Sequence, residues 1–177
     1  MRYSLPLLLA LLTLALATMA QSQPPQPTLP PLALPGAAMP VQAKCAPPGR
    51  KAMAATVLDL LNAERAAAGL KPFRAAPKLA AAAQAHACDN ARTRSLSHVS
   101  PDGADLGTRL KRVGYAFATV AENNALGYNN DPAQVVRGWM ASPPHRANIL
   151  NPGLRQIGLG IGKARAQAWV LVLATPL

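Results

Sequence analysis

Apolar residues recur at a helical spacing in three long segments of the chain. Residues 51–68 carry an apolar side chain every three or four positions and are followed by Gly69, and residues 77–94 repeat the pattern behind an opening proline. In the third segment Asp131 is an N-cap followed by proline, and the apolar stripe ends at Ser142. The pattern therefore predicts three amphipathic helices.

Two shorter helices follow from capping residues. Asp105 can cap a helical turn that Gly114 ends, and Pro143 can open a second one just after the third long helix. This second short helix carries His145 at its start, beside backbone N–H groups that have no partner within the helix.

Strands are predicted where apolar residues alternate with small or polar ones. Residues 157–161 alternate with period two, residues 164–167 have the composition of a hairpin turn, and residues 169–174 read as the returning strand. Residues 115–120 form a further apolar run that leads into Glu122. Few strands, a hairpin and more numerous helices predict an α+β fold, with helices covering an antiparallel sheet.

The first fifty residues differ from the rest. Residues 1–20 have a basic start, a short apolar core and a small-residue cleavage site, which predicts a signal peptide. Residues 21–50 hold nine of the eighteen prolines and predict an extended, unstructured Pro-rich linker. The domain is therefore expected at residues 51–177, in a secreted or periplasmic protein with no transmembrane segment once the signal is removed.

The chain is strongly basic. Eighteen Lys and Arg stand against seven Asp and Glu, a formal net charge of +11. This charge favours weak attraction to anionic surfaces. The cations are scattered and aromatic residues make up only 4% of the chain, so we expect no specific binding of nucleic acid.

Two cysteines, Cys45 and Cys88, can form one disulfide in an oxidising compartment. Such a bond would tie the segment before the domain to the second long helix. The alternative is that Cys88 is a small buried residue of an alanine-rich helix.

Three residues stand out as candidates for chemistry. His98 lies in a loop next to a tight turn, Glu122 follows an apolar run, and His145 begins a helix. Two imidazoles and a carboxylate could hold a divalent ion, zinc or magnesium, or carry out general acid–base catalysis. The spacing alone does not bring them together, and a surface capping role for His145 remains open.

Two other features favour structural roles. His86 falls on the apolar stripe of the second long helix, where a hydrogen-bonded core histidine is expected. The alternating glycines of residues 158–162 suggest a nucleotide loop only superficially, because they lie within a strand pattern and no helix follows.

Several blocks, in order along residues 53–173, give the chain a family resemblance. They are Leu61-Asn62 with Arg65 and Gly69-Leu70, Ser97-His98 with Ser100-Pro-Asp-Gly103, Ala121-Glu122-Asn123, and the block Trp139-Met-Ala-Ser142, His145-Arg-Ala-Asn-Ile-Leu150 and Ile157-Gly-Leu-Gly160. This series resembles the bacterial type of the CAP superfamily, which includes SCP-like domains and cysteine-rich secretory and pathogenesis-related proteins.

The resemblance implies an α-β-α sandwich with a central antiparallel sheet and a polar cavity. It also implies structural roles for Asn62 and Arg65, which lie in a segment similar to the family's opening helix and the turn after it. His98, Glu122 and His145 match the histidine, glutamate and histidine of that cavity. Two departures weaken the expected metal site: the second glutamate of eukaryotic relatives is missing after Trp139, and Gln156 stands where an acid is often found. A cation site with one anionic ligand fewer binds more weakly.

The function expected from this resemblance is binding of a small amphipathic, lipid-like or envelope ligand by a monomer, in a His/Glu/His cleft that could also hold a divalent ion. Two alternatives stay open. One is a hydrolase of peptides, esters or peptidoglycan in which a histidine activates water, and the other is a scaffold whose polar residues only satisfy each other.

Overall fold

The structure is a computed structural model that describes residues 45–177. The predicted signal peptide, residues 1–20, and most of the predicted linker, residues 21–50, lie outside the described residues. Within residues 45–177, no helix is long and apolar enough to cross a membrane.

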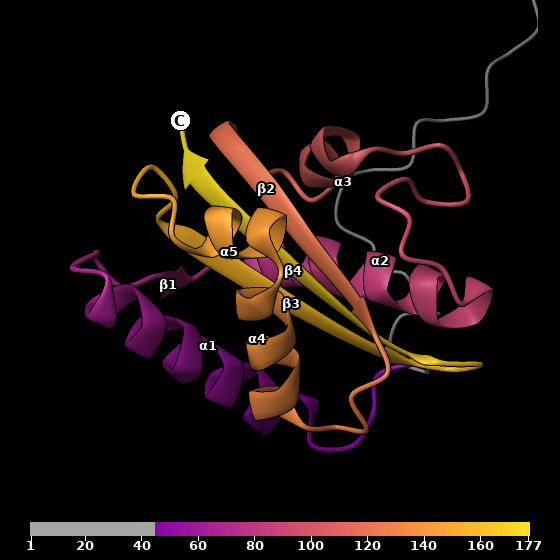
Figure 1. Ribbon diagram of the computed structural model, residues 1–177. Helices are drawn as coiled ribbons and strands as arrows, with labels where there is room; N and C mark the ends of the chain where they lie inside the picture. The colour runs from indigo at the N-terminus through magenta and orange to yellow at the C-terminus, as the bar shows by residue number, and fades with distance from the viewer. Residues whose placement is uncertain (1–44) are drawn as a thin grey trace, which may run out of the picture. The chain divides into compact units, whose positions relative to one another are not determined.

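One sheet of four strands lies at the centre of the domain (Figure 1). Its order is β1-β3-β4-β2, and the strands are β1 (Arg74–Ala75), β2 (Phe117–Leu126), β3 (Gln156–Lys163) and β4 (Gln167–Pro176). The predicted β3–β4 hairpin is present, and β2 pairs with β4 antiparallel. The two-residue β1 was not predicted and pairs parallel with β3, so one edge of the sheet departs from the expected antiparallel arrangement.

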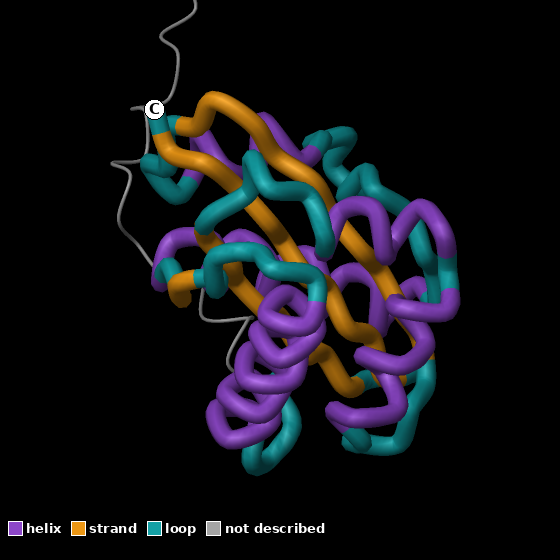
Figure 2. Tube along the Cα trace, turned by 60° about the vertical axis from the view of Figure 1, so that its left-hand side comes forward, coloured by secondary structure: helices purple, strands orange, loops and turns teal. Residues whose placement is uncertain are grey.

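Helices cover both faces of this sheet (Figures 1 and 2). One face carries α1 (Arg50–Ala67), α4 (Pro132–Ala141) and α5 (Pro143–Ile149), and the other carries α2 (Pro77–Thr93) and α3 (Leu106–Arg112). Side chains of β4 alternate between two cores: Trp169 and Leu171 pack in one, Val170 and Val172 in the other. The predicted α-β-α sandwich is confirmed.

The predicted caps form. The Asp131 carboxylate accepts a hydrogen bond from the backbone N–H of Gln134 (3.0 Å), and Asp105 accepts one from that of Thr108 (2.7 Å). Each satisfies a donor that has no partner within its helix.

Arg65 links the first helix to the segment that follows α5. It is 1% exposed, donates to the carbonyl oxygens of Ile149 (2.7 Å) and Asn151 (3.0 Å), and lies over the Phe73 ring. The side-chain amide of Asn62 donates to the carbonyl oxygen of Phe73 (3.3 Å) and accepts from its backbone N–H (2.7 Å). The structural roles predicted for Arg65 and Asn62 are confirmed.

The strand before Glu122 is longer than predicted. The apolar run suggested that it ends near Val120, with the acid just beyond, but β2 continues to Leu126 and Glu122 lies inside it, opposite Val172 of β4. Burying the polar residues Glu122, Asn123 and Asn124 is tolerated because each side chain has hydrogen-bond partners. Apolar periodicity alone could not identify this polar segment as part of the strand.

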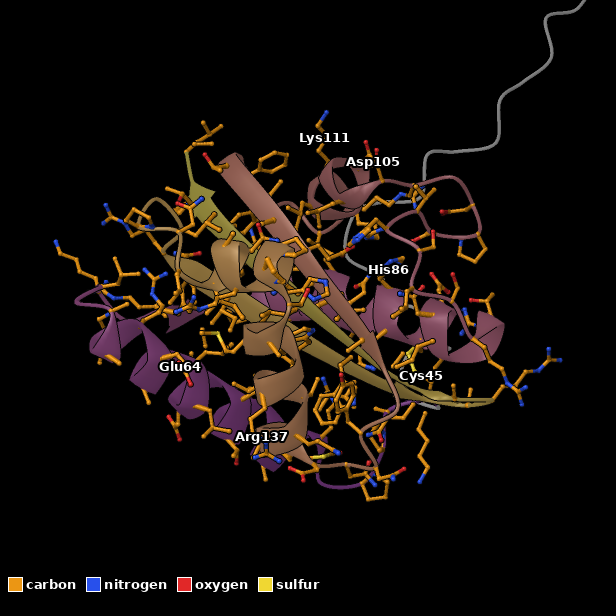
Figure 3. The ribbon with its side chains drawn as sticks, in the orientation of Figure 1. Cys45, Glu64, His86, Asp105, Lys111 and Arg137 are labelled. Atoms are coloured by element: carbon orange, nitrogen blue, oxygen red, sulfur yellow. A yellow bond between two sulfur atoms is a disulfide. The ribbon has the colours of Figure 1, made fainter. Side chains whose placement is uncertain are left out.

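A disulfide joins Cys45 to Cys88 of α2, with the Cα atoms 5.7 Å apart. It fixes the first described residue to the α2 side of the sheet, where Figure 3 labels Cys45. The backbone of Cys45 also accepts a hydrogen bond from the N–H of Lys163 at the end of β3 (2.7 Å).

Candidate functional site

The carboxylate of Glu122 is the centre of the candidate site. Its side chain is 3% exposed, and its two oxygens have different partners. Oε2 accepts a hydrogen bond from Nη2 of Arg109 at 2.5 Å, and Oε1 lies 2.9 Å from Nδ1 of His98. A buried carboxylate is costly unless it is paired, and here a guanidinium supplies the opposite charge.

Arg109 extends from α3 and holds the loop that carries His98. Its Nη1 donates to the carbonyl oxygens of His98 (2.8 Å) and Ala104 (3.2 Å), so one guanidinium fixes both the loop and Glu122. The side chain is 5% exposed, and its Nε has no hydrogen-bond partner among the described residues. Arg109 is therefore a positioning residue of the site.

The His98 imidazole is held at one nitrogen and open at the other. A carboxylate only accepts hydrogen bonds, so Nδ1 of His98 carries the proton that it shares with Glu122. In the neutral ring Nε2 is then an acceptor, and the side chain is 60% exposed. His98 thus presents a polar nitrogen to solvent from a fixed position.

His86 lies behind this pair, on α2 (Figure 3). It is fully buried, its Nε2 lies 2.7 Å from the carbonyl oxygen of Ser97 and 3.8 Å from Oε1 of Glu122, and its Nδ1 lies 3.1 Å from the Ser100 hydroxyl. Burial lowers the pKa of His86, which keeps the ring neutral. The predicted core role is confirmed, and the ring also supports the site.

His145 approaches from the opposite layer, at the start of α5. Burial, and next the charge of His98, lower the pKa of the His145 imidazole, so the two rings lie within electrostatic range. Its side chain forms no hydrogen bond to the other site residues among residues 45–177. Its backbone oxygen accepts one from Asn123 of β2 (3.0 Å), which fixes the start of α5 to the sheet.

The structure thus brings His98 and Glu122 into contact and places His145 near them. We call these three residues the imidazole site. Sequence reasoning missed two of their neighbours, Arg109 and Asn124. The signals were present: Arg109 interrupts the apolar stripe of its helix, and Asn124 continues a run of polar residues next to Glu122. The Asn124 amide donates to the carbonyl oxygen of Ser97 (2.9 Å), which steadies the His98 loop.

A divalent cation does not fit the imidazole site in this arrangement. Arg109 already places a positive charge against Glu122, and both carboxylate oxygens have partners, so a second cation would meet repulsion and find no free anionic ligand. No group of three His, Cys, Asp or Glu side chains in the described part of the chain is arranged to hold a metal ion. Metal binding stays a prediction, and it would require Arg109 to leave the carboxylate.

Comparisons with known proteins place this geometry in a family. The profile described as "CAP: Cysteine-rich secretory protein family" matches residues 58–173. Over 115 residues, 65% of its length, the chain is 37% identical to the uncharacterized protein YkwD of Bacillus subtilis (strain 168). It spans less than half the length of the curated relatives it matches: 44% of YkwD and 31% of the membrane protein YlbC from the same organism.

Solved structures share the fold. An extracellular protein containing an SCP domain from Bacillus anthracis str. Ames matches with a TM-score of 0.63 and 28% identity, over 70% of this chain and 40% of that one. An outer surface protein from Borrelia burgdorferi has a TM-score of 0.63 at 19% identity, over 69% of this chain and 91% of its own, and shows the fold alone. Because the family profile spans most of the described domain and includes all three residues of the imidazole site, the chain belongs to the CAP family of cysteine-rich secretory proteins.

Proposed function

We propose that this protein works outside the cytoplasm, secreted or in the periplasm, and binds a small amphipathic, lipid-like or envelope ligand at the imidazole site. The observation that carries the proposal is the surface around His98. Leu96 is 53% exposed and Val99 is 49% exposed, on the same loop as the exposed imidazole. A polar nitrogen between two exposed apolar side chains suits a ligand with a polar head and an apolar body.

The electrostatics of the site support a ligand that carries acidic or hydroxyl groups. Nε2 of neutral His98 accepts a hydrogen bond from a hydroxyl, and the protonated ring donates one to a phosphate or carboxylate. Arg109 and Glu122 offset each other's charge, so the buried pair adds little net repulsion toward either sign. The loop is fixed from beneath by Arg109 and Asn124, which reduces the ordering cost of binding.

Location outside the cytoplasm has independent support. The similar solved structures include an extracellular protein and an outer surface protein. The Cys45–Cys88 disulfide fits an oxidising compartment, and residues 1–20 have the pattern of a signal peptide.

Isothermal titration calorimetry tests the binding proposal. The protein is titrated with a short-chain phosphatidylglycerol below its micelle concentration, and separately with zinc. We expect heat from the lipid with the wild type, and its loss with His98→Ala and with Leu96→Ser. Lys111→Ala, which removes an exposed cation of α3 (Figure 3), is the control and should bind as the wild type does. Identical null traces for all proteins would remove ligand binding at this site.

A second candidate function, hydrolysis, is favoured by one contact. Glu122 holds Nδ1 of His98, which leaves Nε2 free to take a proton from water. The protein should be screened against peptide, ester and peptidoglycan substrates, with and without chelator. Turnover that is lost in both His98→Ala and His145→Ala would favour an enzyme, and turnover that survives in both would exclude catalysis at the imidazole site.

A further inference from the structure

A pocket lies at the outer edge of β3, across β4 from the strand that carries Glu122: Gly158 in its floor pairs with Val172, and Val172 pairs with Glu122. Its volume is about 400 Å³, and it opens between α1 and the start of α2. The walls include Ala54, Leu58 and Ala80, and the floor is residues 157–159 of β3. This lining is apolar and built mostly of small side chains. We call it the edge pocket.

The edge pocket exists because β1 is too short to cover β3. β1 pairs only with Gln156 and Ile157, and the carbonyl oxygen of Ile157 accepts a hydrogen bond from the N–H of Ala76 (2.8 Å). Further along β3, the backbone groups on the same edge form hydrogen bonds with other parts of the chain. The side-chain amide of Gln84 binds both the N–H (3.0 Å) and the carbonyl (2.9 Å) of Ile161, and Cys45 binds the N–H of Lys163 (2.7 Å).

Leu159 is the gap in this series. Because successive residues of an antiparallel strand turn their main-chain groups to opposite sides, the N–H and C=O of Leu159 face outward, as those of Ile157 and Ile161 do. Neither group has a hydrogen-bond partner outside the hairpin among residues 45–177. The N–H donor and the C=O acceptor of Leu159 lie side by side at the floor of an apolar pocket. They need a partner that offers one acceptor and one donor at the same spacing.

That pair is matched by the main chain of an extended peptide, which adds to a sheet edge through such bonds. Ala76 on one side and Gln84 on the other leave room at the edge for one paired residue, so the bound segment must be a chain end. Arg50 and Lys51 line the pocket, and neither forms an ion pair within the described residues. Nη1 of Arg50 also donates to Oε1 of Gln84 (3.2 Å). No acidic residue lines the pocket. Two cations beside a chain end select a free carboxylate.

We propose that the edge pocket binds the carboxyl-terminal end of a short peptide. The last residues have small apolar side chains that fit between α1 and α2, one residue exchanges both main-chain hydrogen bonds with Leu159, and the carboxylate lies near Arg50 and Lys51. This site is independent of ligand binding at the imidazole site.

Amide-resolved NMR titration with N-acetyl-alanyl-alanine tests the proposal. The Leu159 amide resonance should shift saturably, while the imidazole resonances of His98 stay in place. Ala55→Trp fills the pocket from an exposed position of α1 and should weaken binding about tenfold or more. Ala63→Trp, exposed elsewhere on the same helix, should bind as the wild type does, and the spectra report whether each variant is folded.

Separate controls test the role of the Lys51 charge and the need for a free carboxylate on the peptide. Lys51→Glu should weaken binding, whereas Lys71→Glu makes the same charge change away from the pocket and should not. The peptide with an amidated carboxyl end should bind more weakly than the free acid. The proposal is overturned if the Leu159 resonance does not respond to millimolar peptide, if the amidated peptide binds equally well, or if octanoate shifts Leu159 as strongly as the peptide does.

Discussion

At the scale of single residues, the site depends on one buried acid that contacts both a cation and an imidazole. Glu122 offsets the charge of Arg109, orients His98 and lies 3.8 Å from the buried His86. A buried ion pair adds little net stability, but removing one partner leaves the other charge without compensation.

Glu122→Gln should therefore destabilise the protein strongly. The amide keeps the shape and some hydrogen bonds but leaves Arg109 charged and buried, and the expected loss in free energy of unfolding is about 3–5 kcal/mol. Urea denaturation at pH 7.5 measures it. Asp102→Asn alters the exposed pair with Arg112 and should leave the free energy of unfolding almost unchanged. Equal losses in the two variants would show that Glu122 is not the buried centre described here.

Arg109→Gln should change the response of the imidazole site to zinc. Removing the guanidinium frees one oxygen of Glu122 and removes the repulsion, so zinc affinity should rise about tenfold or more over the wild type. Arg112→Gln, one helical turn away and exposed, is the matched control and should match the wild type. Calorimetry gives the affinities, and circular dichroism checks the fold. Zinc binding of equal strength in all three proteins would refute the blocking role of Arg109.

The sequence identified His98, Glu122 and His145 as candidates, because residue types and family blocks are visible without coordinates. It did not identify Arg109 as their partner. Which cation neutralises a buried acid depends on how α3 packs against β2, and no local pattern carries that information.

At the scale of elements, close packing between α2 and β3 builds one face of the domain. A Cβ placed on Gly158, Gly160 or Gly162 would come within 2.2–2.3 Å of backbone atoms of α2. The three glycines alternate along the strand and so all face the helix, where Ala80, Ala83 and Ala87 continue the smooth surface. Their small size is needed for packing, which agrees with the rejection of a nucleotide loop from the strand pattern.

Gly160→Ala should force α2 away from the sheet. The new methyl group would lie 2.2 Å from the Ala83 backbone, which cannot yield as a side-chain end can, so the melting temperature should fall sharply, with a cost of about 1–3 kcal/mol or more. Gly107→Ala is the control. Its Cβ would lie 3.5 Å from Phe117, an ordinary contact, and alanine in a helix adds up to about 1 kcal/mol. A Gly160 variant as stable as the wild type would contradict the packing described.

Helix starts were the most predictable features, because Asp105 and Asp131 cap their helices through local hydrogen bonds and Pro143 suits a first helical position. The extent of β2 and the presence of β1 were not predictable in this way. β1 is two residues long, and its pairing with β3 depends on a partner more than eighty positions away in the chain.

At the scale of the whole molecule, the sheet joins two helical layers, and each layer contributes one histidine whose pKa is lowered. His86 comes from α2 and His145 from α5, and burial is the main cause that lowers the pKa of each. The order of the layers followed from the family resemblance, whereas the positions of His86 beside Glu122 and of His145 in range of His98 required the folded chain.

Stability should fall as the pH drops from about 6.5, the ordinary histidine pKa. Below it the unfolded chain binds protons that the folded chain does not, down to the lowered folded pKa values of His86 and His145, so the free energy of unfolding decreases with pH in this window. Melting temperatures between pH 7.5 and 5.0 measure it, and His145→Asn should show a smaller drop. Hydrogen bonds lower the pKa values of Asp102 and Asp105, so the protonation of these carboxylates changes the free energy of unfolding only in more acidic solution. A melting temperature that rises toward pH 5.0 would contradict this sign.

The most direct test of the central claim, that His98, Glu122 and His145 form one binding site, is a proton–nitrogen correlation spectrum of the imidazole rings during titration with short-chain phosphatidylglycerol. The predicted result is the Nδ1–H tautomer for His98 in the free protein, with joint shifts of His98 and His145 at a single dissociation constant and no shift of His86. A His98 ring protonated at Nε2 alone, or ligand shifts at one of the two rings without the other, would contradict the account.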